Sequence, residues 1–418
     1  MNKKINKIYK VLIIAMLFIS CFNSNMVFAT DKLTVNAKAS MIVELNSGKV
    51  IYEDNTEVQN YPASLTKILT AILVLENCEL NDTVTVSQSA ISNIPQDYVV
   101  TPLYVGEKIS VKDLLYALLL KSANDAAYVL AEHVGGTVEK FSNMMNKKAE
   151  EIGCKNSHFL NPNGIHDDNH YTTAYDMFLI TKYAIENEKF EKIVSTYRYT
   201  ISTTNKCTTE RVMENSNFFV CPPSKYYDKD VKGIKTGTTQ QAGNCLITNI
   251  EKNGFNVITL VLGAKTKESR FTETKKMIDY MFDNYTHTQI HKQGDIIKTI
   301  EIENATKETK NLNLVISDDV TVMNNIDTKL DEIKPEIILK ENIKAPLKQG
   351  QELGTVKYNV EGLEYTVKLL AEHDVDKKTN FVQIAIGIGT VFMLLCIITI
   401  KKKKMKKKRF KTKKYMRR

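Results

Sequence analysis

Residues 64–76 read SLTKILTAILVLE, and the fold can be worked out from this stretch. Drawn as a helix, it leaves almost no polar face, because apolar side chains surround it: Leu65, Ile68, Leu69, Ile72, Leu73 and Leu75. A helix with apolar side chains on nearly every side is buried inside a domain rather than laid on its surface. We therefore expect other elements to enclose this helix.

Helical spacing continues downstream of this segment. Further helices are expected over residues 110–134, 137–152, 175–185 and 266–285. The first of them has Ser110 at its start and Asp113 three residues on, which is a capping-box pattern. The middle of the chain is therefore predicted to be mainly helical.

Strand-like alternation lies on both sides of this helical middle. Residues 39–45 and 49–52 flank the turn signal Asn46-Ser47-Gly48 and predict a hairpin. Three more strands are expected over residues 231–237, 244–250 and 255–263. Strands at both ends of a helical middle predict one antiparallel sheet closed by distant parts of the chain, an α+β architecture.

A second domain is expected after this first one. We place the first domain at residues 30–287 and a small all-β domain at residues 288–375. Short strand-like segments separated by turns mark the second domain: residues 296–302, 312–316, 336–340, 354–358 and 365–370.

Both ends of the chain carry membrane-related signals. In residues 1–29, four lysines precede an apolar run and a small-residue cleavage site, which predicts a signal peptide, with an uncleaved anchor as the alternative. Residues 381–400 lack any charge and would span about 30 Å as a helix, which predicts a transmembrane helix. Residues 401–418 carry 13 Lys and Arg and no acid, which places this basic tail in the cytoplasm. The expected location is the cell membrane, single-pass, with the folded domains extracytoplasmic.

The distribution of charge argues against nucleic-acid binding. The 418 residues have a net charge of +9, from 57 Lys and Arg and 48 Asp and Glu. Residues 30–400, however, hold 40 basic and 48 acidic residues, because the two ends contain the other 17 basic ones. Binding to phosphates needs a basic patch on the folded domain, so nucleic acid is not expected as a partner.

Cysteine usage indicates neither a zinc finger nor a disulfide framework. The chain has seven cysteines, of which Cys21 and Cys396 lie in the terminal segments. The remaining five include no CxxC pair, so no metal site is expected. Cys207 and Cys221 are left open, either as a disulfide or as free buried thiols.

Three short signatures stand in order along the chain: Ser64-Leu65-Thr66-Lys67, Ser122-Ala123-Asn124 and Lys235-Thr236-Gly237. Each of the patterns SxxK, SxN and KTG occurs once. Any one of them alone is weak evidence, because a helix cap or a solvated lysine would also explain it. Their conjunction, in this order, indicates a serine acyl-transfer site.

The spacing of the first signature has a chemical reason. Positions three apart on a helix share one face, so Lys67 can bring its amine to the Ser64 hydroxyl. A lysine acts as a base only when its pKa is lowered, which burial and the cation of Lys235 would do. In the second signature, Ser122 would relay a proton and Asn124 would hold the lysine or a substrate amide.

The third signature suits substrate binding. Lys235 and Thr236 would offer a cation and a hydroxyl to a carboxylate. Gly237 would let a substrate backbone lie along the strand edge.

With its flanking residues, the sequence resembles the low-molecular-mass penicillin-binding proteins that are serine D-alanyl-D-alanine carboxypeptidases, a peptidase family of the SxxK acyltransferases. The resemblance covers about residues 35–375. Beyond the three signatures it rests on Pro62-Ala63, Asp125-Ala126, Asn163-Gly164-Ile165-His166-Asp167, His170-Tyr171-Thr172-Thr173-Ala174-Tyr175-Asp176-Met177 and Thr238-Thr239. It implies a transpeptidase/β-lactamase-like catalytic domain, with an antiparallel sheet and a helical cluster, followed by a β-rich domain.

The resemblance also implies roles for individual residues. Ser64 would be the acylated nucleophile, Lys67 the general base, and Ser122 and Asn124 the second motif. Substrate would be bound by Lys235, Thr236, Gly237, Thr238 and Arg270. Arg270 matches the family's arginine that grips a terminal carboxylate, while an exposed arginine beginning a helix is the alternative.

The resemblance implies an enzyme that hydrolyses the terminal D-alanine from peptidoglycan stem peptides, without cofactor or metal. β-Lactam antibiotics would be covalent inhibitors, and the cytoplasmic membrane the third partner. Two alternatives stay open, a D,D-endopeptidase of cross-linked peptidoglycan and a non-catalytic penicillin-sensing or wall-binding protein. A β-lactamase is disfavoured because no glutamate stands in a class A pattern to activate a deacylating water.

Two departures from the family's pattern are visible. Residues 381–400 predict a spanning helix, where members often end in an amphipathic surface helix. Asn163 stands where some relatives carry histidine, which changes the polarity of the pocket.

Overall fold

The structure is a computed structural model that describes residues 33–92, 94, 98–379 and 381–415. The predicted signal peptide at residues 1–29 lies outside the described residues. The chain divides into two compact units, Met1–Asp283 and Asn284–Arg418.

One five-stranded antiparallel sheet forms the first unit's framework, as the sequence predicted. Its strands lie in the order β2 (Val50–Asp54), β1 (Ala39–Glu44), β9 (Phe255–Ala264), β8 (Gly243–Lys252) and β7 (Val231–Thr239). The register pairs Met41 with Leu260, so residues more than 200 positions apart are neighbours. The expected hairpin at residues 39–52 is β1 and β2, and the sheet is closed by distant parts of the chain.

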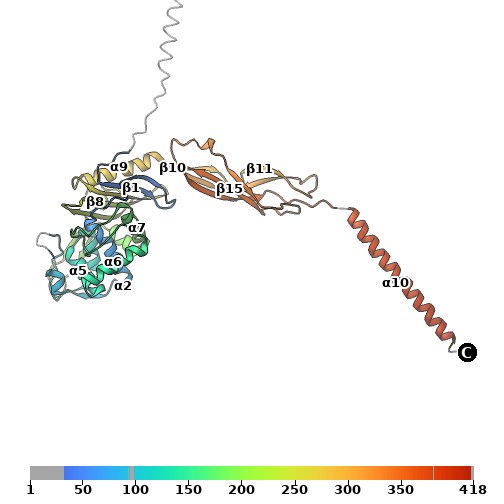
Figure 1. Ribbon diagram of the computed structural model, residues 1–418, viewed down its shortest axis with the longest axis horizontal. Helices are drawn as coiled ribbons and strands as arrows, with labels where there is room; N and C mark the ends of the chain where they lie inside the picture. The colour runs from blue at the N-terminus through green and yellow to red at the C-terminus, as the bar shows by residue number, and fades with distance from the viewer. Residues whose placement is uncertain (1–32, 93, 95–97, 380, 416–418) are drawn as a thin grey trace, which may run out of the picture. The chain divides into compact units, whose positions relative to one another are not determined.

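Helices cover both faces of this sheet (Figure 1). On one face lies α9 (Ser269–Asn284). On the other lies a cluster with α2 (Thr66–Asn77), α5 (Asn124–Gly135), α6 (Val138–Ile152) and α7 (Ala174–Ile185). The smaller elements of the unit are β3 (Thr83–Thr85), α3 (Gln88–Ser92), β4 (Lys108–Ser110), α8 (Glu188–Val194), β5 (Arg198–Ile201), β6 (Arg211–Glu214) and η3 (Phe218–Val220).

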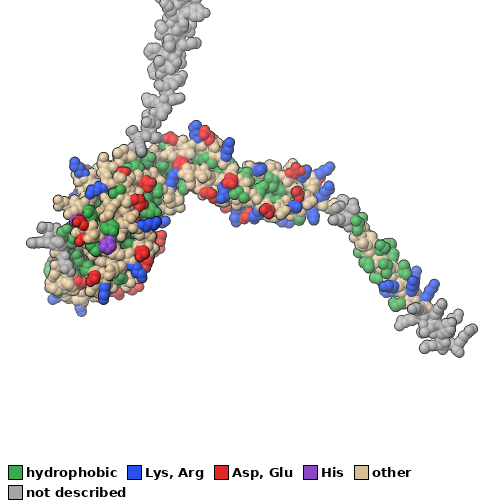
Figure 2. Space-filling model, viewed as in Figure 1, with side chains coloured by type: hydrophobic (Ala, Val, Ile, Leu, Met, Phe, Trp, Pro, Cys, Tyr) green, Lys and Arg blue, Asp and Glu red, His purple; other side chains and the backbone are tan. Residues whose placement is uncertain are grey.

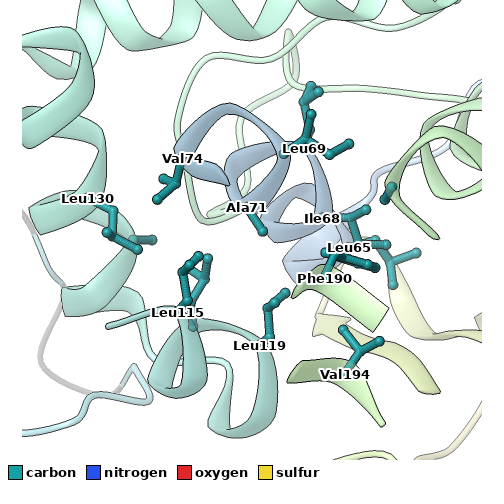
Figure 3. Packing of buried hydrophobic residues seen from close by; sticks show 14 of the residues in the cluster. Leu65, Ile68, Leu69, Ala71, Val74, Leu115, Leu119, Leu130, Phe190 and Val194 are labelled. Atoms are coloured by element: carbon teal, nitrogen blue, oxygen red, sulfur yellow. The ribbon is translucent and has the colours of Figure 1, made fainter. Parts of the chain in front are cut away.

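The apolar helix predicted from residues 64–76 is α2, and it is enclosed as expected. Every residue from Thr66 to Leu75 is buried. Figure 3 shows its apolar side chains among those of neighbouring elements: Leu115, Leu119, Leu130, Phe190 and Val194. A short 3₁₀ turn, η1 (Ala63–Leu65), precedes α2 and carries Ser64.

The prediction of a single helix over residues 110–134 is wrong, because the structure divides this range into separate elements. Ser110 does cap α4 (Val111–Tyr116), because its Oγ accepts the Asp113 N–H at 3.0 Å. The helix then widens into a π-helical turn, η2 (Ala117–Lys121), and ends at Ser122, whose φ of 65° is left-handed. A left-handed residue cannot continue a right-handed helix, so α5 starts anew at Asn124.

The helix predicted over residues 266–285 starts later, at Ser269. Thr266 and Ser269 cap each other: the Thr266 N–H donates to Ser269 Oγ at 2.8 Å, and the Ser269 N–H donates to Thr266 Oγ1 at 2.9 Å. These side-chain bonds satisfy amides at the helix start and fix where it begins.

The second unit is rich in β-structure, as predicted. A five-stranded sheet has the order β11 (Ile296–Glu301), β12 (Asn311–Ile316), β16 (Leu363–Ala371), β15 (Glu352–Val360) and β14 (Glu336–Leu339). A second sheet pairs β10 (Tyr285–His291) with β13 (Val320–Asn325), and a 3₁₀ turn, η4, covers Leu330–Glu332. Neither β10 nor β13 was predicted, because most residues of β10 are polar and do not alternate with apolar ones.

The chain continues into α10 (Phe381–Tyr415). Its segment Ala385–Lys407 is long and apolar enough to cross a membrane. Figure 2 shows hydrophobic side chains along the described part of this helix, followed by lysines. The apolar helix and its basic end are thus where the sequence predicted them.

Cys207 and Cys221 are both free and buried, so the structure decides between the two states left open by the sequence. Each thiol donates to a backbone carbonyl, Cys207 to Thr209 at 3.3 Å and Cys221 to Asn215 at 3.2 Å.

Candidate active site

The SxxK signature places a serine and a lysine side by side. Ser64 lies in η1, and Lys67 lies in the first turn of α2. The two atoms Lys67 Nζ and Ser64 Oγ are 3.0 Å apart. Lys67 is fully buried, whereas Ser64 opens to a cleft.

Lys67 Nζ has three hydrogen-bond partners. It contacts Ser64 Oγ at 3.0 Å, Asn124 Oδ1 at 3.0 Å and the backbone carbonyl of Asn163 at 2.7 Å. The last two oxygens only accept hydrogen bonds, whereas the Ser64 hydroxyl can also donate one. When Lys67 is a neutral amine, its two protons satisfy the two carbonyls and its lone pair faces Ser64. In that state the lone pair of Lys67 is directed toward the Ser64 hydroxyl.

The pKa values of three buried basic side chains are lowered in this region: Lys67, Lys235 and Arg270. Burial and the nearby Lys235 hold the pKa of Lys67 well below its ordinary value, while Asp125 opposes this shift. Burial and Arg270 lower the pKa of Lys235 to about 7. Burial lowers the pKa of Arg270 to about 10. The largest cause in each case is the loss of water around the charged form, which burial makes less stable.

The SxN signature lies where the helix predicted over residues 110–134 is interrupted. The left-handed Ser122 lines the cleft, and Asn124 begins α5. Both the backbone N–H and the Nδ2 of Asn124 donate to the carbonyl of Val99 at 2.9 Å. Val99 therefore fixes the amide so that its oxygen points to Lys67.

Asp125 supports the site from below the cleft lining, and no role for it was predicted from the sequence. Its buried carboxylate accepts the Thr101 N–H at 2.8 Å and the Leu103 N–H at 3.3 Å. These bonds hold the segment that carries Val99, which in turn holds Asn124. Burial raises the pKa of Asp125, and its backbone hydrogen bonds counter that shift.

The KTG signature lies on β7 and forms the opposite wall. Thr236 Oγ1 is 2.7 Å from Ser216 Oγ. A Cβ at Gly237 would lie 3.1 Å from the Pro62 carbonyl and 3.3 Å from the Leu65 nitrogen. A side chain at position 237 would therefore crowd the backbone of the turn that carries Ser64, and glycine leaves β7 free to approach that turn closely.

Arg270 is buried at the start of α9, which excludes the alternative of an exposed arginine. Its Nη1 donates to Thr238 Oγ1 at 3.1 Å and approaches the Gly237 carbonyl at 3.4 Å. The guanidinium also lies over the Phe271 ring, 4.8 Å from its centroid. These contacts aim a cation at the end of the KTG strand.

Most of the predicted site residues meet around one cleft of about 740 Å³. Seven of them line it: Ser64, Ser122, Asn124, Thr236, Gly237, Thr238 and Arg270. Lys67 and Lys235 are buried and are not among its lining residues. Other lining residues were not predicted, including Tyr98, Lys121, Ser216, Phe218 and Lys267, and no role was predicted for His166. Neither Phe218 nor Tyr98 belongs to a motif or to a periodic pattern in the sequence, so nothing in the sequence points to them.

The described lining of the cleft includes Lys121, Lys267 and Arg270 and no Asp, Glu or Cys. Such a set suits an anionic ligand and offers no carboxylate or thiolate to a metal. It also offers no carboxylate that could activate a water, as a class A β-lactamase would need.

Comparison with known proteins gives two family matches. Residues 26–266 match the family Peptidase_S11, described as D-alanyl-D-alanine carboxypeptidase. Residues 285–377 match the family described as penicillin-binding protein 5, C-terminal domain.

Individual proteins match over most of their length. The chain is 32% identical over 359 residues to the D-alanyl-D-alanine carboxypeptidase DacF of Bacillus subtilis, covering 84% of this chain and 89% of that protein. It is 30% identical over 339 residues to the D-alanyl-D-alanine carboxypeptidase DacC of Escherichia coli, covering 79% and 81%. Its fold is similar to the crystal structure of penicillin-binding protein 5 from Haemophilus influenzae, with a TM-score of 0.60 and 30% identity over 82% of this chain and 98% of that chain.

Proposed function

This chain belongs to the D-alanyl-D-alanine carboxypeptidase family, and on that premise we propose that Ser64 attacks the bond between the two terminal D-alanines of a peptidoglycan stem peptide. The protein is a serine-type D-alanyl-D-alanine carboxypeptidase, a hydrolase of peptidoglycan metabolism. The roles below are assigned to this chain's own residues. The observation that carries them is the contact of 3.0 Å between Lys67 Nζ and Ser64 Oγ.

In the proposed first step, the lone pair of Lys67 takes the Ser64 proton as Oγ forms a bond to the penultimate D-alanine's carbonyl carbon. The C–N bond then breaks, and the proton passes to the leaving amine of the terminal D-alanine through Ser122, which lines the cleft beside the serine. In the second step water attacks the ester, and its proton returns through Lys67 to Ser64. Atoms balance as one water consumed and one D-alanine released.

The terminal carboxylate of the substrate would bind at the end of β7. Arg270 and the hydroxyl of Thr238 already contact each other there, at 3.1 Å, and the Thr236 hydroxyl lies on the same cleft. Lys235, fully buried beneath them, adds positive potential. A carboxylate would replace water around these groups and gain charge-assisted hydrogen bonds.

Binding of β-lactams follows from membership of this family. We assign the adduct to Ser64, because a β-lactam carbonyl would meet the same nucleophile and base. Hydrolysis of that adduct would be slower than in a class A β-lactamase, since the described lining of the cleft lacks the additional carboxylate that activates water there.

For location, we propose that residues 381–400 span the cytoplasmic membrane and that residues 401–418 lie in the cytoplasm. Support comes from the apolar segment of α10 and from the lysines that follow it without a spacer. Both folded units would then be extracytoplasmic, which is where peptidoglycan lies.

A second candidate function is cleavage of cross-linked peptides. A cavity of about 580 Å³ adjoins the cleft and shares Phe218, Lys267 and Arg270 with it. Because it begins at the proposed carboxylate-binding arginine, a leaving group larger than D-alanine could extend into it. Its aromatic lining, with Tyr226 and Phe271, would pack against such a group.

One experiment tests these assignments together. Mass spectrometry after exposure to penicillin should find one adduct on the Ser64 peptide, and Ser64→Ala should abolish both the adduct and D-alanine release. Ser195→Ala, at the exposed end of α8, is the matched control and should keep both. Labelling that survives Ser64→Ala would move the nucleophile elsewhere, and labelling without D-alanine release would favour the penicillin-sensing alternative. Release of monomers from a purified cross-linked dimer would establish the second candidate function.

A further inference from the structure

The two helices that carry catalytic motifs run side by side in the same direction. Lys67, in the first turn of α2, donates to Asn124, the first residue of α5, at 3.0 Å. Farther along, Val74 of α2 and Leu130 of α5 extend into the same apolar space (Figure 3). The C-terminal ends of the two helices should therefore also be neighbours, about 18 Å from the catalytic ends for helices of 12 residues.

A cluster of three potential metal ligands lies at those far ends. The ligand atoms of Cys78, Asp82 and His133 all lie within 4.8 Å of one another. Cys78 is the C-cap of α2, and His133 lies in the last turn of α5. Asp82 belongs to the turn between α2 and β3. Cys78 is half-buried and the other two side chains are exposed, so an ion could enter from solvent.

The turn that carries Cys78 and Asp82 is anchored before any ion binds. The Lys112 N–H donates to the Leu80 carbonyl at 2.9 Å, and the Val111 N–H donates to the Asp82 carbonyl at 2.9 Å. The Asp82 carboxylate also accepts the Glu79 N–H at 2.8 Å, which orients it. These bonds reduce the conformational entropy that binding an ion would cost.

We propose that Cys78, Asp82 and His133 form a binding site for a divalent transition-metal ion of the zinc type, with water as the fourth ligand. A thiolate, an imidazole and a carboxylate are the donor set that Zn²⁺ takes, whereas Mg²⁺ and Ca²⁺ prefer oxygen alone. At metal–ligand distances of about 2.0 to 2.3 Å, tetrahedral donors lie about 3.3 to 3.8 Å apart. Side-chain rotations that move the ligand atoms by about 1 Å would close the site, and the thiol proton would leave to solvent.

The site lies away from the reaction. Its ligands are outside the cleft lined by Ser64, and a bound ion would tie the end of α2 to the end of α5. The expected effect is therefore on the stability of the helix pair that holds Lys67 and Asn124 in place, and not on the chemical step. An ion that binds the folded state and not the unfolded chain raises the free energy of unfolding by RT ln(1 + [ion]/Kd), so the melting temperature rises with the logarithm of the ion concentration.

The test is a titration of the full chain in detergent, stripped of metal and kept reduced with a phosphine. Co²⁺ alone should give a near-ultraviolet thiolate charge-transfer band that saturates at one equivalent, and Zn²⁺ should displace it. With Zn²⁺ at 100 times Kd, the melting temperature should rise by about 5 °C.

Three variants decide the outcome. Cys78→Ser should remove the band, and His133→Gln should weaken binding by at least about 10-fold, both with D-alanine release unchanged. His133 is exposed, so its variant keeps the test valid if Cys78→Ser fails to fold. Cys154→Ser removes a second half-buried thiol outside the cluster and should leave the band intact. A band that is absent from the natural sequence, or that persists in both ligand variants, would overturn the proposal.

Discussion

Acid should destabilise the catalytic unit through one buried histidine, His170. The exposed fraction of His170 is 2%. Its Nδ1 accepts the Leu160 N–H at 3.1 Å, so the neutral ring carries its proton on Nε2, which lies 2.9 Å from Thr66 Oγ1. Thr66 is the first residue of α2, and Leu160 precedes the segment that supplies Asn163 to Lys67. Protonation of Nδ1 would break this link.

The magnitude follows from the pKa. Burial lowers the pKa of His170 to about 4 from an ordinary 6.5. Between these two pH values the unfolded chain binds a proton that the folded chain does not, so the stability of the fold rises with pH in this window. The stabilisation that comes from the neutral His170 is fully present above pH 6.5 and is lost progressively as the pH falls to 4. At about 1.4 kcal/mol per pKa unit, the difference between 6.5 and about 4 corresponds to a loss of about 3 kcal/mol in the free energy of unfolding.

The assay is urea unfolding followed by circular dichroism from pH 4 to 7, with penicillin labelling as a second probe of the catalytic unit. His170→Gln keeps an acceptor for Leu160 and a donor for Thr66 but cannot titrate. Between pH 6.5 and pH 4, its free energy of unfolding should therefore fall by about 3 kcal/mol less than that of the natural sequence. His133→Gln removes an exposed imidazole of the same unit that is not among the groups shifting the pKa of His170, and in metal-free buffer it should behave like the natural sequence. Parallel pH curves for all three proteins would refute the reasoning.

Four further outcomes are expected. Lys67→Ala should slow acylation by penicillin at least about 10²-fold in stopped-flow labelling, and an unchanged rate would show that another group takes the proton. Arg270→Ala should lower kcat/KM for a D-alanyl-D-alanine peptide about 10- to 150-fold, and an equal loss with the C-terminally amidated peptide would contradict its role. Asp125→Asn removes the charge that raises the pKa of Lys67, so the acid limb of the pH–kcat/KM profile should move to lower pH, and no movement would argue against Lys67 as the base. Truncation before Phe381 should give a soluble protein that still releases D-alanine, whereas a truncated chain that stays with membranes would reveal a second anchor.

Much of the geometry of the candidate active site could be predicted because it depends on short spacings. Ser64 and Lys67 are held by one turn of helix, so their contact is implied by the sequence itself. The interruption at Ser122 could not be predicted, because a π-helical turn and a left-handed serine arise from tertiary packing rather than from local preference. A continuous helix would not have brought Asn124 to Lys67 in the same way.

Residues that act through long-range contacts were also beyond prediction. Asp125 supports the cleft through backbone amides more than 20 positions away, and nothing in its neighbours signals that partner. Cys78, Asp82 and His133 come together only because α2 and α5 run in parallel, whereas the rule that excluded metal relied on CxxC spacing. Strand β10 was not predicted because most of its residues are polar and show no alternation between apolar and polar side chains.

The pairing of β1 with β9 sets the order in which the unit can assemble during synthesis. Until residues 255–264 have been made, β1 and β2 are a lone hairpin, and such a hairpin is at best marginally stable in water. The wall formed by β7, and Arg270 beyond it, arrive just as late. The nascent chain therefore carries Ser64 and Lys67 for about 200 residues before any cleft exists around them. The first unit therefore stays without its complete sheet for that whole interval, and catalytic activity can appear only after residues 255–270 have been made.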